Sequence, residues 1–424
     1  MKKIKKIKDG FISRNGSLLK YALRTGTSII KNKDDPKKIL EDIMGTNVTK
    51  FVSELSHYKG SITKAGQLLS QYGELFFDKK INDKLKIIQN STHFLDFEDI
   101  KSNLSQKAIN DLIIEKDPIA AASIGQIHKA KVKDTNQECI MKIQYKGIEK
   151  AIEYDLYFIK MLTKAVGIFP KTLDTKSIFI EIEKILKMEM DYERELAVQS
   201  KYKSLISDDS LHVPDVYKSY SSQKSICMEY IDGIALSSID DLTPTQINRN
   251  FIGEKIFDLF LKELYEFNLI QTDAHGGNYY VSKDLKKIYL LDFGACIDFE
   301  EEIISFYRNF IKFAYLDSRD NFFDEFDRFI LYWGEEFNYD KDSMWKYIQL
   351  LSSPLRSENY NWNDQNFTQK LYDEGKNLRE TIEIKTVPHF FIFLDRKLLG
   401  LYSLMNGLKA AFNVKKCMER NIRV

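Results

Sequence analysis

Alternating apolar and polar residues between positions 127 and 145 predict a β-hairpin. The first strand is expected at Ile127–Val132 and the second at Cys139–Tyr145, because both are rich in β-favouring residues. A polar run from Lys133 to Glu138 joins the two strands and supplies the turn. Since successive side chains of a strand point to opposite faces, the second strand presents Lys142 on one face of a sheet.

Longer stretches have the periodicity of helices. Residues from about 37 to 105 indicate helices, with Ser61 as an N-cap, and a long helical region is expected from Ile148 to Ser204. A further strand is expected at Lys224–Tyr230, and helices predominate after it. The segment Glu300–Ile311, which has an acidic first turn, is one of these helices.

Three polar motifs follow one another along the chain: Lys142, the segment Thr272–Asn278 and the tripeptide Asp292–Gly294. The spacing of Asp273 and Asn278 is that of a protein kinase catalytic loop, in which the carboxylate orients the attacking hydroxyl and the amide oxygen binds magnesium. Asp292 would supply the second magnesium ligand. Taken together, the motifs predict binding of ATP or ADP with Mg²⁺, whereas Lys142 alone would more often be a solvent-facing strand residue.

A phosphate-binding lysine of this kind needs a carboxylate partner. The segment Glu189–Glu195 offers four carboxylates on nearby helical turns, and Glu195 is the expected partner of Lys142. At ~4 Å and an effective dielectric constant of ~20, such a pair gains about 4 kcal/mol of Coulomb energy, much of which desolvation offsets. The pair is expected to order the helix against the sheet.

Where a protein kinase has a glycine-rich phosphate loop, this chain has Ala120–Gln126, which begins with three alanines. That run could also begin a helix. Far upstream is a Lys-x-Gly-Gln motif at 64–67, and Glu189 and Asp191 form a Glu-x-Asp pair. With the metal-binding residues, the set resembles the UbiB family of atypical kinases, also called ADCK or aarF-domain proteins. The resemblance covers most of the chain, and it implies an α+β, protein kinase-like bilobal fold with a small β-containing N-lobe, a helical C-lobe and a helical N-terminal extension.

The resemblance also implies a role for each motif. Lys64 and Gln67 would belong to an element covering the region where a peptide substrate would lie, and Glu189 and Asp191 would hold Lys64. The expected catalytic residues are Asp273, Lys142 and Glu195, and the expected metal ligands are Asn278 and Asp292. The expected nucleotide-binding residues are Ala120, Ala121, Ala122, Ser123 and Lys142, together with Met228, Glu229 and Tyr230 as a hinge for adenine.

Proteins of this family look like ATP-binding enzymes with ATPase activity. They support biosynthesis of isoprenoid quinones, notably ubiquinone, at a membrane surface. The resemblance therefore implies a nucleotide, a quinone-like lipid, a membrane surface and quinone-biosynthesis enzymes as partners. Two alternatives stay open: a phosphotransferase acting on a small molecule or lipid, and a nucleotide-binding pseudokinase scaffold. Phosphorylation of proteins in trans is not expected, because no Ala-Pro-Glu follows Asp292–Gly294 and the helix from Glu300 leaves little room for an activation loop.

The catalytic loop departs from the commonest pattern of the family, His-Ala-Asp-Pro-His-Pro-Gly-Asn. Here Gln271 replaces the first histidine, and Ala274 and Gly276 replace the prolines. The aspartate and asparagine remain, so the metal chemistry is retained. The sequence does not determine how rigid the loop is, because Gly276 and Gly277 allow backbone conformations that proline excludes.

Composition narrows the class of protein. The 424 residues carry 63 basic and 62 acidic side chains, a net charge of +1, which argues against nucleic-acid binding. The four cysteines have no paired spacing, so they are expected to be buried thiols rather than disulfides or metal ligands. No apolar run approaches the ~18 residues of a spanning helix.

Charge gathers at the start of the chain. Between Met1 and Lys33 there are eight lysines and two arginines against Asp9 alone, with apolar residues at helical spacing. A basic amphipathic helix on an anionic membrane would have this pattern, and a solvated basic tail or a mitochondrial transit peptide are the alternatives. We therefore expect a peripherally membrane-associated protein of the cytoplasm or mitochondrial matrix side. Four segments are expected: 1–36 basic amphipathic, 37–109 helical extension, 110–230 N-lobe and 231–424 C-lobe.

Overall fold

The computed structural model describes residues 2–4, 93–122, 124–150, 152–153, 156–157, 160, 175–334, 338–382 and 389–422. Lys64, Gln67, Ser61, Ser123 and most of the basic N-terminal segment lie outside these residues. The chain divides into two compact units. The N-terminal unit comprises Met1–Ala197 and Asp215–Tyr230, and the C-terminal unit comprises Val198–Pro214 and Ile231–Val424. The four-segment division stays a prediction.

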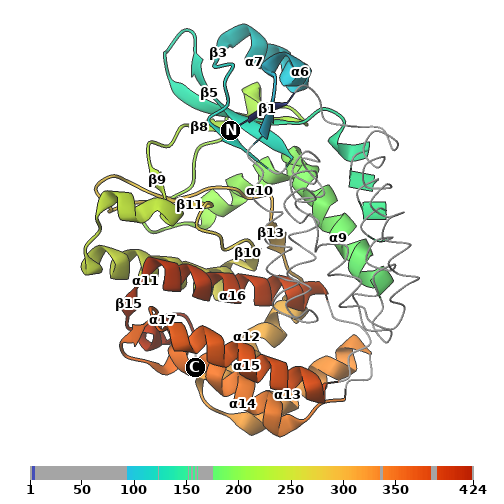
Figure 1. Ribbon diagram of the computed structural model, residues 1–424, viewed down its shortest axis with the longest axis vertical. Coiled ribbons are helices and arrows are strands. Elements are labelled where there is room, and N and C mark those ends of the chain that lie inside the picture. The colour runs from blue at the N-terminus through green and yellow to red at the C-terminus, as the bar shows by residue number, and fades with distance from the viewer. Residues whose placement is uncertain are drawn as a thin grey trace, which may run out of the picture. The chain divides into compact units, whose positions relative to one another are not determined.

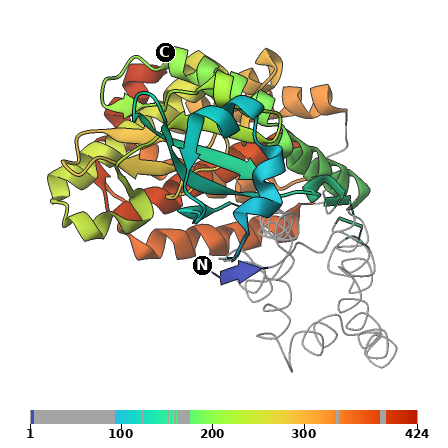
Figure 2. The same cartoon turned by 90° about the horizontal axis from the view of Figure 1, so that it is seen from above.

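A five-stranded antiparallel sheet forms the core of the N-terminal unit (Figure 1). Its central hairpin is the one expected from the sequence, and in it Lys142 lies opposite Ile127. Seen from above, the strands lie side by side (Figure 2). The strands are β3 (Leu112–Ile114), β4 (Ala120–Ala121), β5 (Gly125–Val132), β6 (Glu138–Gln144) and β8 (Ser225–Glu229), in the order β3-β5-β6-β8 with β4 also paired to β5.

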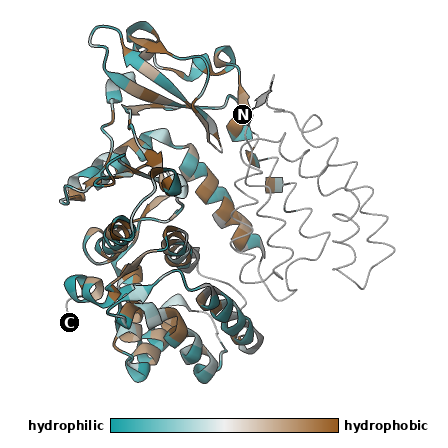
Figure 3. Cartoon of the chain, turned by 60° about the vertical axis from the view of Figure 1, so that its left-hand side comes forward, coloured by the Kyte–Doolittle hydropathy of each residue, from teal (hydrophilic) through white to brown (hydrophobic). Residues whose placement is uncertain are grey.

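The alternation of side chains in β6 decides which face of the sheet is buried. Cys139, Met141 and Ile143 have no exposed surface and point into the core, whereas Lys142 points to the other face. Bands of hydrophobic and hydrophilic residues accordingly alternate along the strands (Figure 3). Gly125 is required at the start of β5, because a Cβ atom there would lie 2.4 Å from the carbonyl oxygen of Ile143.

A short strand corrects the helical expectation for residues 37 to 105. Strand β2 (His93–Leu95) pairs in parallel with β1 (Lys2–Ile4), so the helix expected at 93–95 is wrong. The reason is long-range pairing, which local periodicity does not contain: Gln126 of β5 exchanges two hydrogen bonds with the backbone of Leu95, at 2.9 and 3.1 Å. Helix α6 (Phe97–Ile100), a 3₁₀ turn (Lys101–Asn103) and helix α7 (Gln106–Asp111) follow.

The long helical region expected up to Ser204 is interrupted at Asp191. Helix α9 (Thr175–Met190) ends there and α10 (Tyr192–Leu205) begins. The carboxylate of Asp191 accepts a hydrogen bond from the backbone N–H of Arg194 at 2.9 Å, as an N-cap does, which explains the break. The boundary between the two units falls within α10.

In the C-terminal unit, the expected catalytic and metal-binding residues lie in loops between short strands. Thr272–Asn278 joins strand β10 to strand β11, and Asp292–Gly294 lies between β12 and β13. The strands are β7 (Leu211–His212), β9 (Ile234–Ala235), β10 (Leu269–Gln271), β11 (Tyr279–Val281), β12 (Ile288–Leu290) and β13 (Cys296–Asp298). The orders are β7-β12-β11-β9 and β10-β13.

The rest of the C-terminal unit is mainly helical, as expected. Helix α11 is followed directly by a π-helical turn, Glu263–Phe267, and α16 lies beside α11 (Figure 1). The helices are α11 (Gln246–Lys262), α12 (Glu301–Tyr315), α13 (Arg319–Trp333), α14 (Lys341–Ser352), α15 (Gln365–Thr381), α16 (His389–Leu408) and α17 (Val414–Asn421). Smaller elements are the 3₁₀ turns Lys218–Tyr220, Leu236–Leu242 and Ser353–Arg356, and the paired strands β14 (Tyr360–Asn361) and β15 (Ala411–Phe412).

Aromatic side chains fill the core between α12 and α13. Phe310 contacts Phe322, Phe326 and Phe329, with ring centroids 5.4 to 6.0 Å apart. The four cysteines are buried and unpaired, which confirms the expectation of free thiols. Within the described part of the chain, we find no helix of the length and apolar character needed to cross a bilayer.

Candidate active site

Lys142 and Glu195 form a buried ion pair in the N-terminal unit. The Nζ atom of Lys142 donates to both carboxylate oxygens of Glu195, at 2.7 and 3.0 Å, and the two side chains are 11% and 1% exposed. The ring of Tyr192 lies 5.2 Å from the same Nζ atom. Because strand β6 and helix α10 carry the two partners, the pair ties the helix to the sheet. Its role in nucleotide binding stays a prediction.

The alanine-rich loop is the tip of a β-hairpin. Ala120 lies opposite Ile127 and Ala121 opposite Gln126, so the run does not begin a helix. The backbone N–H of Ala122 donates to the carbonyl of Gly125 at 2.9 Å. That amide is therefore engaged within the hairpin, and a phosphate would have to use other donors of the loop or displace this bond.

The Glu-x-Asp pair lies at the junction of α9 and α10. Glu189 is buried near the end of α9, whereas Asp191 is exposed and caps α10. Gln144 at the end of β6 donates to the carbonyl of Met190, which fixes the junction against the sheet. Since Lys64 and Gln67 are outside the described residues, their pairing with this junction stays a prediction.

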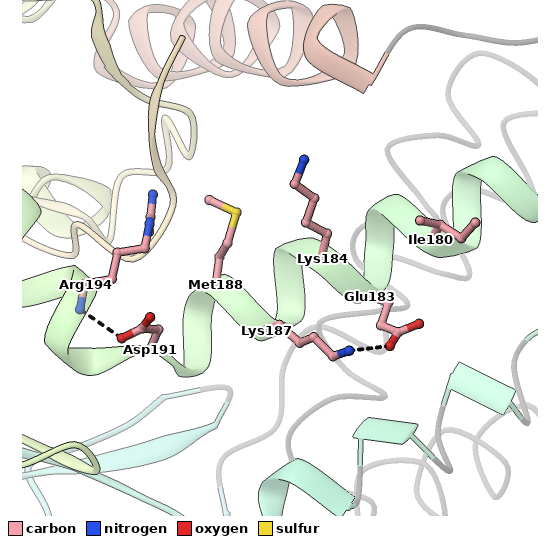
Figure 4. Close-up of a pocket in the computed structure, with 7 residues that line it drawn as sticks. All are labelled: Ile180, Glu183, Lys184, Lys187, Met188, Asp191 and Arg194. Carbon is pink, nitrogen blue, oxygen red and sulfur yellow. Dashed lines mark hydrogen bonds and ion pairs between the residues drawn. The ribbon is translucent and has the colours of Figure 1, made fainter. Parts of the chain in front are cut away.

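A shallow pocket of about 470 Å³ runs along the same helices. In Figure 4, Lys184, Met188 and Arg194 point to one side of α9 and α10, while Lys187 pairs with Glu183 on another. The pocket is lined by Ile180, Glu183, Lys184, Lys187, Met188, Asp191 and Arg194. Its surface of mixed charge adjoins the Glu-x-Asp junction and includes Asp191.

Two of the hinge residues expected to contact adenine, Met228 and Glu229, lie at the end of β8, and Tyr230 directly follows it. Met228 is buried and lies opposite Ile140, while Glu229 lies opposite Cys139. The Lys129 ammonium lies 4.2 Å from the centre of the Tyr230 ring. Strand β8 is the last strand in the order of the sheet and pairs with the strand that carries Lys142. Its other side forms backbone hydrogen bonds with residues 215–217.

Hydrogen bonds converge on the carbonyl oxygen of Asp273 in the C-terminal unit. The side-chain amide of Asn278 donates to it at 3.0 Å, and the backbone N–H of His275 donates at 2.8 Å. These bonds close the loop and turn the nitrogen of the Asn278 amide inward, which leaves its oxygen for a cation. The Nδ1 atom of His275 accepts from the backbone of Gly277, a local structural role.

Gln271 joins the catalytic loop to the Asp-Phe-Gly segment. Its Nε2 atom lies 3.0 Å from the carbonyl oxygen of Asp273 and 3.5 Å from that of Asp292. The side chain is buried at the position where the family pattern has histidine. Neither Gly276 nor Gly277 has a positive φ, so hydrogen bonding and packing hold this loop in place of the missing prolines.

Asp292 has a backbone conformation that few residues adopt. Its φ is 63°, in the left-handed region, and its carboxylate accepts from the N–H of Gly294 at 3.1 Å. Phe293 beside it is buried against Tyr202, with ring centroids 5.1 Å apart. The carboxylate of Asp292 and the amide oxygen of Asn278 are hard oxygen donors, the type that Mg²⁺ prefers, and Mg²⁺ keeps waters and phosphates as its other ligands. The donor set therefore fits magnesium.

Helix α16 supplies contacts to the catalytic loop that the sequence did not reveal. The Nη2 atom of Arg396 lies 2.7 Å from Oδ1 of Asp273. One turn further on, a Cβ atom at Gly400 would lie 3.1 Å from the carbonyl oxygen of Ala274, so the helix and loop backbones pack closely there. No motif marks Arg396, because its partner is distant in the chain and a lone arginine in an apolar helix has no distinctive spacing.

Comparison with known proteins defines the class. Residues 96–323 match the ABC1 atypical kinase-like domain, so the chain belongs to this family, which confirms the predicted membership and the kinase-like α+β fold. It is 33% identical over 282 residues to atypical kinase COQ8 of Schizosaccharomyces pombe, covering 65% of this chain and 45% of that one. It is 29% identical to COQ8 of Saccharomyces cerevisiae, covering 88% and 76%.

Similarities to two further proteins are consistent with this family and fold. The chain is 29% identical over 231 residues to the probable protein kinase UbiB of Vibrio parahaemolyticus, covering 52% of this chain and 42% of that one. A solved complex of Rv3197 with erythromycin from Mycobacterium tuberculosis is 20% identical, has a TM-score of 0.58, and is matched over 92% of this chain and 98% of its own. At that identity the structural likeness shows the fold.

Proposed function

We propose that this chain is a magnesium-dependent ATPase that supports isoprenoid quinone biosynthesis, of the ubiquinone type, at a membrane surface. The observation that carries the proposal is the hydrogen-bonded loop from Asp273 to Asn278, joined by Gln271 to Asp292. In this arrangement the carboxylate of Asp273 would orient an acceptor, and Asn278 and Asp292 would supply two oxygen ligands for a cation. A protein that only bound nucleotide as a scaffold would have no need for all three.

Each predicted site residue has a place in this proposal. Lys142, oriented by Glu195, would contact the phosphates of ATP or ADP, and the hairpin tip would approach them. The hinge at Met228, Glu229 and Tyr230 would contact adenine. Asn278 and Asp292 would hold Mg²⁺, which supplies positive charge against the phosphate oxygens when bound.

Water is the proposed acceptor. In the C-terminal unit, strand β13 begins at Cys296 and helix α12 at Glu301, directly after Asp292–Gly294. The described chain therefore has no long segment there of the kind that docks a peptide in protein kinases. Asp273 would orient the water molecule, and Glu189 and Asp191 would hold Lys64 in the element that covers the peptide site.

The biological setting is part of the same proposal. Relatives named as mitochondrial COQ8 kinases and as UbiB support a role with quinone-biosynthesis enzymes and a quinone-like lipid, on the matrix or cytoplasmic side of a membrane. The lysine-rich segment before Lys33 would attract anionic lipids, each basic residue near the surface contributing about 1 kcal/mol.

Hydrolysis by the purified chain tests the proposal. Release of inorganic phosphate from ATP is measured with and without Mg²⁺, anionic liposomes and an isoprenoid phenol. We expect turnover that requires Mg²⁺ and rises with the lipid and phenol. Transfer of radiolabel from ATP to the phenol would instead identify a lipid phosphotransferase, and magnesium-dependent binding without turnover would identify a scaffold.

A further inference from the structure

The ammonium group of Lys142 lies over the ring of Tyr192. Its Nζ atom is 5.2 Å from the centre of the ring, and Tyr192 has no exposed surface. A cation within ~6 Å of the face of an aromatic ring is attracted by the negative potential of that face, and the attraction is stronger away from water. The same Nζ atom donates to both carboxylate oxygens of Glu195, at 2.7 and 3.0 Å. Two side chains therefore hold one cation.

Both of these side chains come from the first turn of helix α10. Tyr192 is the first residue of the helix and Glu195 lies three positions later, so the two side chains are neighbours on one face. Asp191, directly before them, accepts from the backbone N–H of Arg194 and caps this turn. The start of α10 therefore sets the position of the Lys142 ammonium group.

The hydroxyl end of Tyr192 lies against the base of the alanine-rich hairpin. A Cβ atom at Gly125, the first residue of β5, would lie 3.1 Å from the Tyr192 hydroxyl oxygen. The carbonyl of Gly125 accepts from the backbone N–H of Ala122 in the tip of that hairpin, at 2.9 Å. Tyr192 thus contacts both Lys142 and the base of the hairpin, the two elements proposed to approach the phosphates.

An uncharged ring suits this position because it attracts a cation without cancelling its charge. A second carboxylate in place of the ring would neutralise Lys142 beside Glu195 and would repel the phosphates of a nucleotide. We propose that Tyr192 is a positioning residue, which holds the Lys142 ammonium group for the phosphates of a nucleotide through a cation–π contact. This inference rests on the proposed function and adds a residue to it.

Fluorinated phenylalanines at position 192 test the contact with little change in shape. Each fluorine withdraws electron density from the ring face and so weakens its attraction for a cation. The full-length chain is prepared as wild type, as Tyr192→Phe and with mono-, di- or trifluorophenylalanine at this position, and its affinities for MgADP and adenosine are measured. We expect Tyr192→Phe to keep the wild-type ratio of the two affinities. The trifluorinated ring should weaken MgADP about fivefold, equivalent to ~1 kcal/mol, and leave adenosine unchanged.

Two controls separate positioning from packing. Phe97 is also buried, and its ring packs edge-on against His128, which lies opposite Met141 and so on the other face of the sheet from Lys142. Fluorination of Phe97 should leave both affinities unchanged. In the Lys142→Met background, fluorination at position 192 should no longer weaken MgADP, because the cation is absent.

The outcomes distinguish this inference from the proposed function. Binding of MgADP that does not vary with the number of fluorines would overturn the inference and leave the proposed function standing. An equal loss for adenosine, or a loss that persists in the Lys142→Met background, would also overturn it, because Tyr192 would then act through packing. If the wild type binds neither MgADP nor adenosine, the proposed function fails and the inference fails with it.

Discussion

Lys397 and Glu263 form an ion pair that is almost wholly removed from solvent. The Nζ atom lies 2.7 Å from Oε2, and the side chains are 2% and 1% exposed. Glu263 also accepts from the hydroxyl of Tyr202 at 2.6 Å and from the backbone N–H of Gln271 at 3.2 Å. Burial alone would lower the pKa of Lys397, but the Glu263 carboxylate holds that pKa above its usual value. The pair therefore anchors α16 under the strand that leads into the catalytic loop.

Lys397→Met should destabilise the protein strongly. Removing one partner leaves the carboxylate of Glu263 buried without its cation, which typically costs about 3 to 5 kcal/mol. The free energy of unfolding in urea measures the loss. Glu263→Gln in the same background should restore part of it, because the remaining amide still offers an oxygen to Tyr202. Equal stability of Lys397→Met and wild type would contradict this account.

Gln271→Leu should weaken nucleotide binding more than it weakens folding. The leucine removes the amide that reaches the carbonyls of Asp273 and Asp292, but it also removes a buried oxygen that has no partner in the described structure. These effects partly cancel, so we expect a stability change within about 1.5 kcal/mol. Affinity for MgATP should fall severalfold. Gln271→His, which supplies a ring N–H donor, is the matched control and should retain affinity.

Asp292→Asn should fold normally and lose its response to magnesium. Asparagine tolerates the positive φ of this position, and its side-chain oxygen can still accept from Gly294, but it brings no charge to a hard cation. Thermal shift by ATP with and without Mg²⁺ measures this. Saturating ligand at 100 times its Kd adds about 2.7 kcal/mol to wild type, and the magnesium-dependent part should disappear in the variant. An unaltered magnesium response would exclude Asp292 as a ligand.

Asp395→Asn should stabilise the protein at neutral pH. Burial raises the pKa of Asp395 to about 6 from an ordinary 3.8, although the hydrogen bond from Tyr307 opposes the rise. The folded state therefore binds more protons than the unfolded state between about pH 4 and 6, so this carboxyl makes stability fall as pH rises through that window. At pH 7 the amide should gain up to about 3 kcal/mol, and near pH 4 nothing. Urea unfolding at both pH values checks the difference, and an equal gain at both would refute the titration.

The local sequence pattern predicts those parts of the candidate site that are formed by residues close together in the chain. The hairpin that carries Lys142 follows from alternation, and the loop from Asp273 to Asn278 follows from spacing. The pairing of Lys142 with Glu195 was also expected, because the helix had to supply a carboxylate. In each case the sequence of one or two secondary-structure elements is sufficient for the prediction.

Contacts between distant segments were not accessible from pattern. The backbone of strand β2 is held by the side chain of Gln126, which lies 31 residues further along the chain. Arg396 and Lys397 lie in a stretch whose hydrophobic residues predict only a buried helix. Their partners become evident once α16 is placed against the loop, because burial makes both charges require a counterion.

The distance along the chain between α16 and the loop that it contacts has a consequence for biosynthesis. Translation releases Glu263 and Asp273 long before Arg396, Lys397 and Gly400 emerge. Until then the two carboxylates lack their counterions, and the loop lacks the helix against which it packs. Domains generally fold as units once their sequence is available. On the ribosome, a nascent chain would therefore hold this loop in its final conformation only after α16 has been synthesised.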